Sequence, residues 1–495
     1  MIALLIILSL SALFFTSLIN LIPLLENFFP IDRVEAVLFT INQNMDGSNE
    51  IVSFFLKKLF LESAYYFALV TVGVSAISFA IAKQKRLPLK QTIIKTGIIC
   101  NILLFTSFIY VALNTFPLGR YLKLWRENMK EPEHSFLYTN EYIPYSKISF
   151  KEGKKNLVVI FLESIESNFQ DKKNGGDLDT NRIPEITQWI KENDSFSPGG
   201  KPIFGTGWTI ASTVAKTCGI PLNFPSGVFH SVSGIKNFLP GATCLSDILN
   251  DQGYNVLFAQ GSKSDFASMN AFAETHGKSD LHDYDYYVNS GRFSSENRVN
   301  WGINDRTLFE LAKDDLDSLS KKSKPFAMFL STIDAHMPYG YMDPQCSHPN
   351  QSPKEQYPYV LQCNSKLLDE FLKWSTKQPW FDNTIIAVMG DHETYVPAEA
   401  VGFKNSEITH HWLNFFVNSK ASSKKEKRDF TSFDMYPTIL EAMGAEITTH
   451  ALGLGRSLYS DEPTLLEKYG SDSLNNLLKG RSKEYDFFLY GKKSK

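Results

Sequence analysis

The sequence predicts an N-terminal helical membrane domain with about three transmembrane helices, followed by an α/β domain with a mostly parallel sheet. Two observations indicate this class: long apolar runs are confined to the N-terminal part of the 495-residue chain, and short apolar runs alternate with helical patterns after it. The expected division is a transmembrane domain over 1–116, a juxtamembrane connector over 117–155, the α/β domain over 156–460 and a polar C-terminal tail over 461–495, which we expect to pack on the domain surface.

Three apolar runs are long enough to span a bilayer, which takes about 20 residues. They cover roughly Ile2–Leu25, Leu59–Ala82 and Thr96–Phe116. A cleaved signal peptide is the alternative for the first run. However, no basic residue precedes that run and no small-residue cleavage pattern follows it. We therefore expect an uncleaved helix.

The loop between the second and third runs indicates the orientation. It carries no acidic residue and five basic ones, which are Lys83, Lys85, Arg86, Lys90 and Lys95. Short basic loops stay in the cytoplasm. With three spans, the C-terminal part of the chain then lies on the outer side of the membrane. The basic residues after the third run are mixed with acidic ones, which is typical of an interfacial amphipathic helix.

Charge and cysteine usage agree with an extracytoplasmic enzyme. The net charge of -3 does not indicate a nucleic-acid partner. Cys100 lies in the third run, whereas the other four cysteines lie in the α/β part, and an even number in an oxidising compartment suggests two disulfides. Proximity in sequence favours Cys218–Cys244 and Cys346–Cys363, but other pairings and four buried free thiols remain open.

Five apolar runs are the expected strands: Leu157–Leu162, Asn255–Ala259, Phe326–Ile333, Thr384–Met389 and Leu413–Val417. Uninterrupted apolar strands suit a sheet that helices cover on both faces. Strands that alternate with helices favour a mostly parallel, doubly wound arrangement. In such sheets, sites form at the carboxyl ends of the strands, so polar residues at these ends are the first candidates.

Two strand ends carry residues that suit a divalent metal. Glu163 follows the first run, and Asp391 and His392 follow the fourth within a Gly-Asp-His-Glu segment. Carboxylate and imidazole together suit Zn²⁺ or Mn²⁺. On its own, Glu163 could equally be a surface residue or a helix cap. On its own, the Asp-His pair could equally be a strand-end turn with a capping aspartate and a surface histidine.

A third strand end carries His336, which precedes a turn fixed by Pro338. A histidine there can hold a phosphate oxygen or protonate a leaving group, although a plain loop histidine is the alternative.

The segment around Thr209 predicts a nucleophile at the start of a helix. Gly205 and Gly207 permit close backbone approach, and a helical run extends from Thr209 to about Cys218. A helix N-terminus favours a bound phosphate. A bound metal lowers the pKa of a hydroxyl and makes it a competent nucleophile. A threonine that only caps the helix is the alternative.

Together these residues fit one mechanism. Glu163, Asp391 and His392 would hold the metal, and the Thr209 hydroxyl, also coordinated to it, would attack phosphorus. The metal and backbone donors would stabilise the charge on the transferred group.

Four segments in this order resemble the sulfatase-like phosphoglycerol and phosphoethanolamine transferases of the alkaline phosphatase and sulfatase superfamily: Phe161–Ser164, Gly207–Ala211, Asp334–His336 and Gly390–Glu393. The chain most resembles the phosphoglycerol transferases that decorate osmoregulated periplasmic glucans, and it is more distantly similar to lipoteichoic acid synthase. The resemblance covers roughly 156–460, whereas the membrane part matches only in general plan.

The resemblance implies an alkaline-phosphatase-like α/β fold, a divalent metal and a ping-pong reaction through a phosphothreonine intermediate. Mn²⁺ is the expected metal, with Zn²⁺ or Mg²⁺ as alternatives. By position, Glu163, Thr209, Asp391 and His392 carry over as the metal and nucleophile set.

The resemblance also implies contacts to the transferred group from His336, Trp301 and Trp208. True sulfatases carry a formylglycine in a Cys/Ser-x-Pro-x-Arg context, which the segment Thr209–Thr213 lacks. Sulfate ester hydrolysis is therefore not expected.

The leading hypothesis is transfer of phosphoglycerol from phosphatidylglycerol to an extracytoplasmic glycan, with diacylglycerol left behind. A lipid donor explains a membrane anchor, and we expect a multi-pass protein of the bacterial inner membrane with a periplasmic catalytic domain. The alternatives are phosphoethanolamine transfer to lipopolysaccharide or another glycan, transfer to water by a phosphodiesterase, and a catalytically inactive scaffold.

Overall fold

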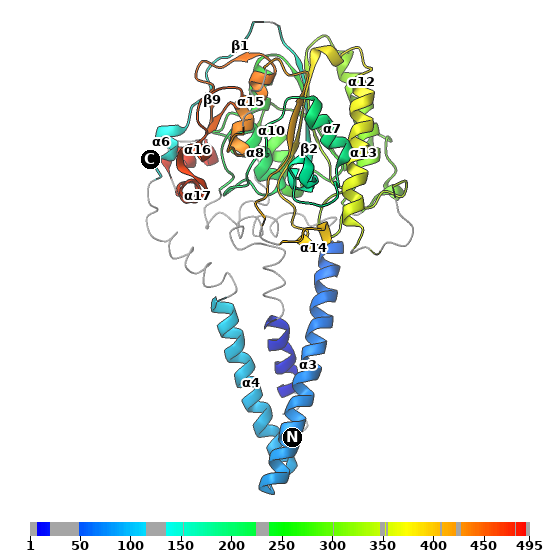
Figure 1. Cartoon of the computed structure of the whole chain (residues 1–495), viewed down its shortest axis with the longest axis vertical. Coiled ribbons are helices and arrows are strands. Elements are labelled where there is room, and N and C mark those ends of the chain that lie inside the picture. Colours follow the sequence, from blue (N-terminus) through cyan, green and yellow to red (C-terminus); the bar gives the residue numbers. More distant parts are fainter. Residues whose placement is uncertain are drawn as a thin grey trace. The chain divides into compact units, whose positions relative to one another are not determined.

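The computed structural model shows two compact units (Figure 1). The first comprises Met1–Val34 and Ser48–Glu131, and the second comprises Glu35–Gly47 and Pro132–Lys495. The residues that the structure describes are 7–19, 49–114, 135–151, 153–223, 237–299, 301–346, 352, 355–405, 408–421, 427–480 and 482–491.

The first unit contains two long apolar helices, α3 (Asn49–Lys85) and α4 (Leu89–Asn114), which pack against each other. Each contains a stretch long and apolar enough to cross a membrane, Ser63–Lys85 and Leu89–Val111, with a mean hydropathy of 1.8. These stretches correspond to the second and third expected spans. A shorter apolar helix covers Ile7–Ile19, and the rest of the first expected span lies outside the described residues.

The second unit is built on a six-stranded sheet with the strand order β4-β3-β5-β2-β6-β7. Neighbouring strands from β4 to β6 run parallel, whereas β7 runs antiparallel to β6. The sheet is therefore mostly parallel, as the sequence predicts. The strands are β2 (Asn156–Leu162), β3 (Asn255–Gln260), β4 (Asp280–His282), β5 (Phe326–Ser331), β6 (Thr384–Gly390) and β7 (Asn414–Val417).

Helices cover both faces of this sheet, which explains why its central strands are almost entirely apolar. Every residue of β2 and β6 is buried. Strands that are buried on both faces read as continuous apolar runs rather than as an alternation. In Figure 1, one face carries α7 (Pro184–Glu192), α12 (Asp305–Ser320) and α13 (Tyr357–Ser375), and the other carries α8 (Thr209–Cys218), α10 (Met269–Thr275) and α15 (Met435–Ala442).

The C-terminal stretch that we expected on the domain surface contributes to the hydrophobic core. It folds into α16 (Leu465–Tyr469), α17 (Ser471–Lys479) and α18 (Lys483–Tyr490). Leu474 and Tyr485 are buried in the same cluster as the sheet residues. Few of its residues are apolar, but they recur at helical spacing and form one buried face.

Shorter elements complete the second unit. The structure describes the expected connector from residue 135 onward, except residue 152, and its strand β1 (Ser149–Phe150) pairs antiparallel with β8 (Ala445–Glu446). Further elements of this unit are α6 (Leu137–Glu141), β1 (Ser149–Phe150), η2 (Ser167–Phe169), η3 (Lys172–Asn174), α9 (Leu245–Asp251), α11 (Tyr284–Asn289), α14 (Ala398–Val401), β8 (Ala445–Glu446), β9 (Ala451–Leu452) and β10 (Gly455–Arg456).

Two disulfides join segments of this unit. Cys218, the last residue of α8, is bonded to Cys244, which directly precedes α9. Cys346 is bonded to Cys363 of α13. These are the pairs that sequence proximity favours. Cys100, in α4, is the free cysteine among the described residues.

Candidate metal centre and nucleophile

Three buried ligand residues meet at the carboxyl ends of two adjacent strands. Glu163 directly follows β2, and Asp391 and His392 directly follow β6. The parallel register pairs the last residues of these strands, Leu162 and Gly390, so the side chains that follow emerge at the same level. The ligand atoms of the three residues all lie within 4.8 Å of one another.

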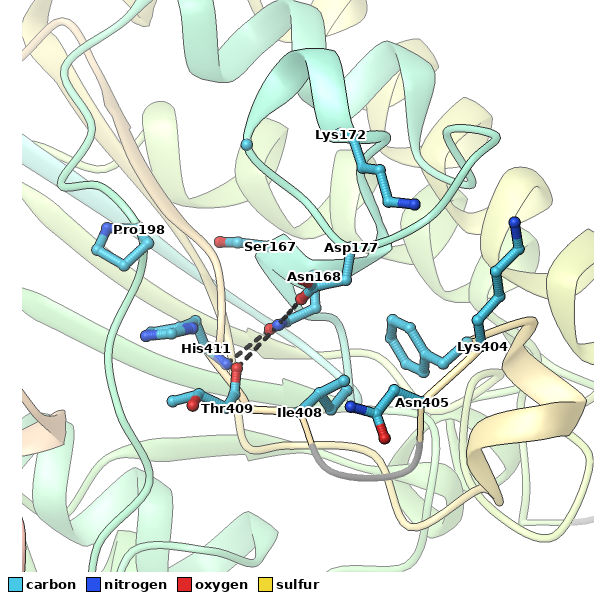
Figure 2. Close-up of a pocket in the computed structure, with 12 residues that line it drawn as sticks. Ser167, Asn168, Lys172, Asp177, Pro198, Lys404, Asn405, Ile408, Thr409 and His411 are labelled. Atoms are coloured by element: carbon cyan, nitrogen blue, oxygen red, sulfur yellow. Dashed lines mark hydrogen bonds between the residues drawn. The ribbon is translucent and has the colours of Figure 1, made fainter.

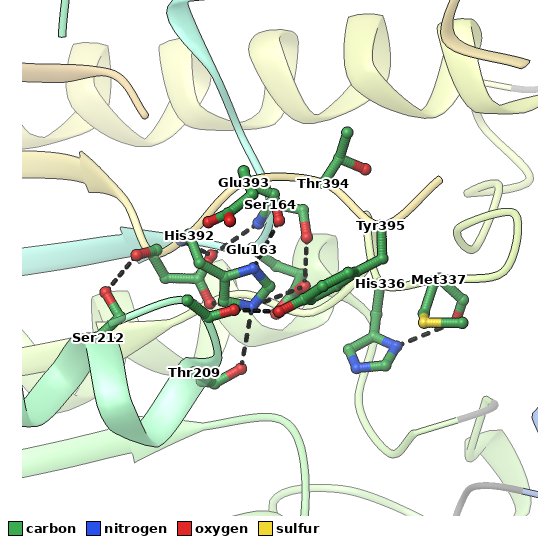
Figure 3. Close-up of polar contacts among 12 residues, drawn as sticks. Glu163, Ser164, Thr209, Ser212, His336, Met337, His392, Glu393, Thr394 and Tyr395 are labelled. Atoms are coloured by element: carbon green, nitrogen blue, oxygen red, sulfur yellow. Dashed lines mark hydrogen bonds and ion pairs between the residues drawn. The ribbon is translucent and has the colours of Figure 1, made fainter. Parts of the chain in front are cut away.

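The nucleophile candidate lies beside this trio. The Nε2 atom of His392 is 3.3 Å from Asp391 Oδ2 and 3.7 Å from Glu163 Oε1. The Oγ1 atom of Thr209 lies 3.5 Å from the same nitrogen. Figure 3 shows the side chains of Glu163 and Thr209 directed towards the imidazole of His392. The structure therefore brings the four residues of the predicted metal and nucleophile set together.

A hydrogen bond of His392 fixes the orientation of its ring. Its Nδ1 atom lies 2.8 Å from the backbone carbonyl of Glu393. A carbonyl oxygen only accepts, so Nδ1 donates to it, and Nε2 is the ring nitrogen that faces the two carboxylates. Histidines that bind metals are oriented in this way by their second nitrogen.

The electrostatics of the trio fit a divalent cation. Burial, and then the neighbouring Asp391 carboxylate, raise the pKa of Glu163 well above its usual range. Two buried carboxylates this close repel each other when both are ionised. A cation held between them would relieve that repulsion and accept the Nε2 lone pair of His392. The donor set of two carboxylates and one imidazole suits Zn²⁺, Mn²⁺ or another divalent ion.

Hydrogen bonds from Ser164 and from the backbone of His392 hold the two carboxylates in place. Asp391 Oδ1 accepts hydrogen bonds from the backbone N–H groups of Ser164 and His392, each at 2.7 Å. The hydroxyl of Ser164 donates to Glu163 Oε1 at 2.7 Å. Ser164 adopts a positive φ of 56°, which is uncommon for a residue with a side chain. This backbone conformation allows Ser164 to contact both carboxylates, Asp391 through its N–H and Glu163 through its hydroxyl.

Thr209 is the first residue of α8, and Trp208 occupies the cap position. No side chain caps this helix end, so the structure does not show Thr209 as a capping residue. Its hydroxyl instead faces His392. The first N–H groups of a helix lack intrahelical partners and attract an anion. Thr209 is thus positioned where a phosphate would find both a nucleophile and backbone donors.

His336 and Trp301 lie together near the same edge of the sheet. Their ring centroids are 4.4 Å apart. Burial lowers the pKa of His336 to about 4, and the charges of His392 and Asp391 also act on it. The Nδ1 atom of His336 lies 3.0 Å from the carbonyl of Met337, to which it donates. The neutral ring therefore presents Nε2 as an acceptor.

The start of α12 positions the loop that carries His336. The carboxylate of Asp305, the first residue of α12, accepts hydrogen bonds from the backbone N–H groups of Ile333 at 2.7 Å and Asp334 at 3.2 Å. Asp334 in turn accepts from the backbone N–H of Asp305 at 2.9 Å. These reciprocal bonds lock the loop after β5 against the helix.

A buried lysine that was not among the predicted site residues contacts a residue of the candidate metal centre. Lys216, on α8, is fully buried, and its Nζ atom donates to the carbonyl of Asp391 at 2.6 Å and to the hydroxyl of Ser212. It also lies 4.2 Å from the ring centroid of Trp412. Burial lowers its pKa to about 7. Lys216 therefore ties the helix that carries Thr209 to a metal-ligand residue.

Three comparisons place this geometry among known proteins. The family model described as Sulfatase matches residues 155–445, which include every residue of the candidate metal centre. The chain is 28% identical over 363 residues to phosphoglycerol transferase I of Xanthomonas axonopodis pv. citri (strain 306), with 72% of this chain and 50% of that protein covered. It is 30% identical over 324 residues to phosphoglycerol transferase I of Escherichia coli (strain 55989 / EAEC), with 63% and 40% covered.

The chain thus spans about half the length of the curated relatives that it matches, or less. Among solved structures, a protein of the alkaline phosphatase superfamily from Vibrio parahaemolyticus aligns with a TM-score of 0.51 at 21% identity. The alignment covers 70% of this chain and 79% of that one. This similarity supports the alkaline-phosphatase-like α/β fold.

Proposed function

The chain belongs to the sulfatase family, and from that premise we propose that it is a metal-dependent phosphotransferase with Thr209 as its nucleophile. It would transfer phosphoglycerol from phosphatidylglycerol to an extracytoplasmic glycan. The observation that carries this proposal is the position of Thr209 Oγ1, 3.5 Å from Nε2 of His392 and at the start of a helix. Two relatives named phosphoglycerol transferase I support the choice of transferred group.

Glu163, Asp391, His392 and the Thr209 hydroxyl would hold the metal, for which we propose Mn²⁺, with Zn²⁺ or Mg²⁺ as alternatives. The bound cation would lower the pKa of that hydroxyl and offset negative charge on the phosphoryl oxygens.

The chemistry of the chain's own residues then runs in two steps. In the first, Thr209 Oγ1 attacks the phosphorus of the lipid phosphodiester and loses its proton. The phosphorus–oxygen bond to diacylglycerol breaks, and the departing oxygen takes up a proton. In the second, a glycan hydroxyl attacks the phosphorus of the phosphothreonine and loses its proton, the phosphorus–oxygen bond to Thr209 breaks, and Thr209 Oγ1 regains a proton. The N–H groups at the start of α8 bind the phosphoryl oxygens in both steps.

His336 and Trp301 would bind the small head group. The neutral His336 ring presents Nε2 as an acceptor, which suits a hydroxyl donor such as those of glycerol. Trp301 packs on this ring and contributes an apolar wall. Trp208, which precedes Thr209 and is partly buried, would line the entrance to the nucleophile.

We also propose a location. The protein would be a multi-pass protein of the bacterial inner membrane, with the second unit in the periplasm. Helices α3 and α4 are long and apolar enough to span a bilayer, and the short connection between them is basic. Two disulfides in the second unit suit an oxidising compartment.

Mass spectrometry of the purified full chain tests the proposal. The protein is incubated with Mn²⁺ and either phosphatidylglycerol or phosphatidylethanolamine. A phosphoglycerol adduct on Thr209, with diacylglycerol released from phosphatidylglycerol alone, would support it. An ethanolamine phosphate adduct would instead assign the sister activity, transfer of phosphoethanolamine to lipopolysaccharide or another glycan.

Two variants serve as controls. Thr209→Ala should form no adduct and release no diacylglycerol. Thr307→Ala alters another threonine in the first turn of a helix, α12, and should behave as the wild type. Diacylglycerol release by Thr209→Ala at the wild-type rate would refute the assignment of the nucleophile.

A further inference from the structure

A pocket opens beside the loops of the candidate metal centre (Figure 2). It has a volume of about 440 Å³ and lies between residues 167–177, which follow β2, and residues 403–405 and 408–411, which precede β7. This volume is within the usual range for small-molecule sites, roughly 300–1,000 Å³.

Asn168 cross-links the two walls of the pocket. Its side-chain amide donates to the carbonyl of Thr409 at 2.9 Å and to Asp177 Oδ2 at 2.5 Å. Its oxygen accepts from the backbone N–H of His411 at 2.7 Å. Asn168 is only 4% exposed, so these bonds form in the interior, and Figure 2 shows them bridging the walls. The pocket is therefore preformed.

The charges on the rim compensate one another. Lys172 and Lys404 approach the same carboxylate, that of Asp179, at 2.8 and 2.5 Å. The hydrogen bonds and charges of these two lysines lower the pKa of Asp179 to about 2. Asp177 adds a further negative charge to the lining. A pocket with this balance offers a phosphate or another anion little net attraction.

The remaining lining suits a neutral ligand with many hydroxyl groups. Asn405 and Thr409 contribute an amide and a hydroxyl at exposed positions, and Ser167 adds a second hydroxyl. Phe403 and Pro198 supply apolar surface. Neutral donors and acceptors beside an aromatic side chain can hydrogen-bond the hydroxyls of a sugar and pack against its apolar face.

A short chain of hydrogen bonds connects the loops of this pocket to the loop of the candidate metal centre. Glu166 is fully buried, and its Oε1 accepts from the backbone N–H of Thr394, two residues after His392, at 2.8 Å. Its Oε2 lies 2.7 Å from Nδ1 of His410, which is adjacent to the pocket residue His411. The pocket and the metal ligands thus share the loops at one edge of the sheet.

We propose that this pocket binds a neutral sugar residue of the acceptor glycan. The assignment of the sugar as part of an acceptor rests on the proposed function. The pocket would hold the glycan while one of the glycan's hydroxyls reaches the phosphothreonine. The choice of acceptor would then depend on residues that take no part in the phosphoryl transfer itself.

Saturation-transfer NMR on the full chain tests binding without any catalytic step. The protein is held in a detergent without a sugar head group and mixed with millimolar gentiobiose, cellobiose or maltose. We expect transfer to the ring protons of at least one disaccharide. The signal should disappear in the double variant Asn405→Ala/Thr409→Val and persist in Asn250→Ala, a matched change at an exposed position on α9.

Kinetics provide the second measurement. In the double variant, KM for the glycan acceptor should rise about tenfold, as the loss of two hydrogen bonds implies. The rate of adduct formation on Thr209 should stay within about twofold of the wild type, because the donor half-reaction does not use the pocket. The single variant Thr409→Val gives the same test with a smaller effect if the double variant is unstable.

Several outcomes would overturn the proposal. They are the absence of a signal from any of the disaccharides with the wild type, an unchanged signal with the double variant, or displacement of the sugar by inorganic phosphate, which would indicate an anion site. Sugar binding without any adduct on Thr209 would instead refute the proposed function and leave the sugar site intact.

Discussion

Removal of the Cys218–Cys244 disulfide should destabilise the second unit by about 3.5 kcal/mol. The two cysteines are 26 residues apart. Closing a loop of that length in the unfolded chain removes about 12 cal/mol/K of entropy, which is about 3.5 kcal/mol at 25 °C. The same calculation for Cys346–Cys363, with a separation of 17 residues, gives about 3.1 kcal/mol. Replacing either pair with alanine should therefore cost similar stability.

The two pairs should differ in their effect on catalysis. Cys218 ends the helix that Thr209 begins, and its partner Cys244 precedes α9. Without this bond, the helix that carries the nucleophile loses its covalent attachment at the far end. Cys346–Cys363 has no such connection to α8. We expect slower adduct formation on Thr209 in Cys218→Ala/Cys244→Ala and an unchanged rate in the other double variant.

Thermal unfolding and adduct kinetics on both double variants measure these effects. At about 2.1 cal/mol/K of unfolding entropy per residue, a unit of roughly 375 residues shifts by about 1.3 °C per kcal/mol, so each midpoint should fall by roughly 4–5 °C. Shifts below about 1 °C would refute the loop-entropy estimate. An equal loss of adduct formation in both variants would refute the argument that the bond at the end of α8 positions the nucleophile.

Three further predictions concern the metal centre and its neighbours. Lys216→Met should slow adduct formation on the order of tenfold. It should shift the unfolding midpoint by only a few degrees, because an apolar side chain avoids the cost of burying the amine. Lys366→Met, a change at an exposed position on α13, serves as its control. Chelation of divalent metals should abolish adduct formation, and added Mn²⁺ should restore it; Asp391→Asn should need a higher Mn²⁺ concentration. The pKa of His336 is about 4 in the folded chain, whereas a histidine in the unfolded chain has a pKa of about 6.5. Between these two pH values the unfolded chain binds more protons, so stability falls as the pH drops from about 6.5 to about 4. His336→Gln should flatten the dependence of the unfolding midpoint on pH in this range.

The sheet was largely predictable because its central strands are buried on both faces. β2 and β6 lie within one residue of the predicted runs. The run from Phe326 was predicted to reach Ile333, but β5 ends at Ser331, because the backbone N–H groups of Ile333 and Asp334 donate to the carboxylate of Asp305 instead of to a neighbouring strand. β4 was missed because only one of its three residues, Leu281, is apolar.

The direction of β7 was not predictable from its composition. An apolar strand has the same composition in a parallel and an antiparallel arrangement, and no turn signal in the sequence reveals its reversal next to β6. The burial of the C-terminal stretch in the core was not predictable for a related reason. A few apolar residues at helical spacing among many polar ones do not indicate how deeply they are buried.

The proximity of the candidate metal ligands was predictable because Glu163 and Asp391 directly follow apolar runs, where parallel sheets place their sites. Lys216 was not, because a lysine in a helix usually faces solvent. Its hydrogen-bond partner, the carbonyl of Asp391, lies 175 residues away in sequence. The spacing of Thr209, Ser212 and Lys216 on one helical face was the available signal, since it placed a cation on the side that carries the nucleophile.

The parallel pairing of β2 with β6 has a consequence for biogenesis. The residues that it brings together are far apart in the chain: Ser164, which holds both carboxylates, contacts Asp391 across 227 positions. A nascent chain emerges from its N-terminus, so Glu163 is made long before Asp391 and His392. The three candidate ligands come together only once β6 has joined the sheet. The proposed metal capture would therefore be a late event in maturation, and it would depend on the ions present where the domain folds.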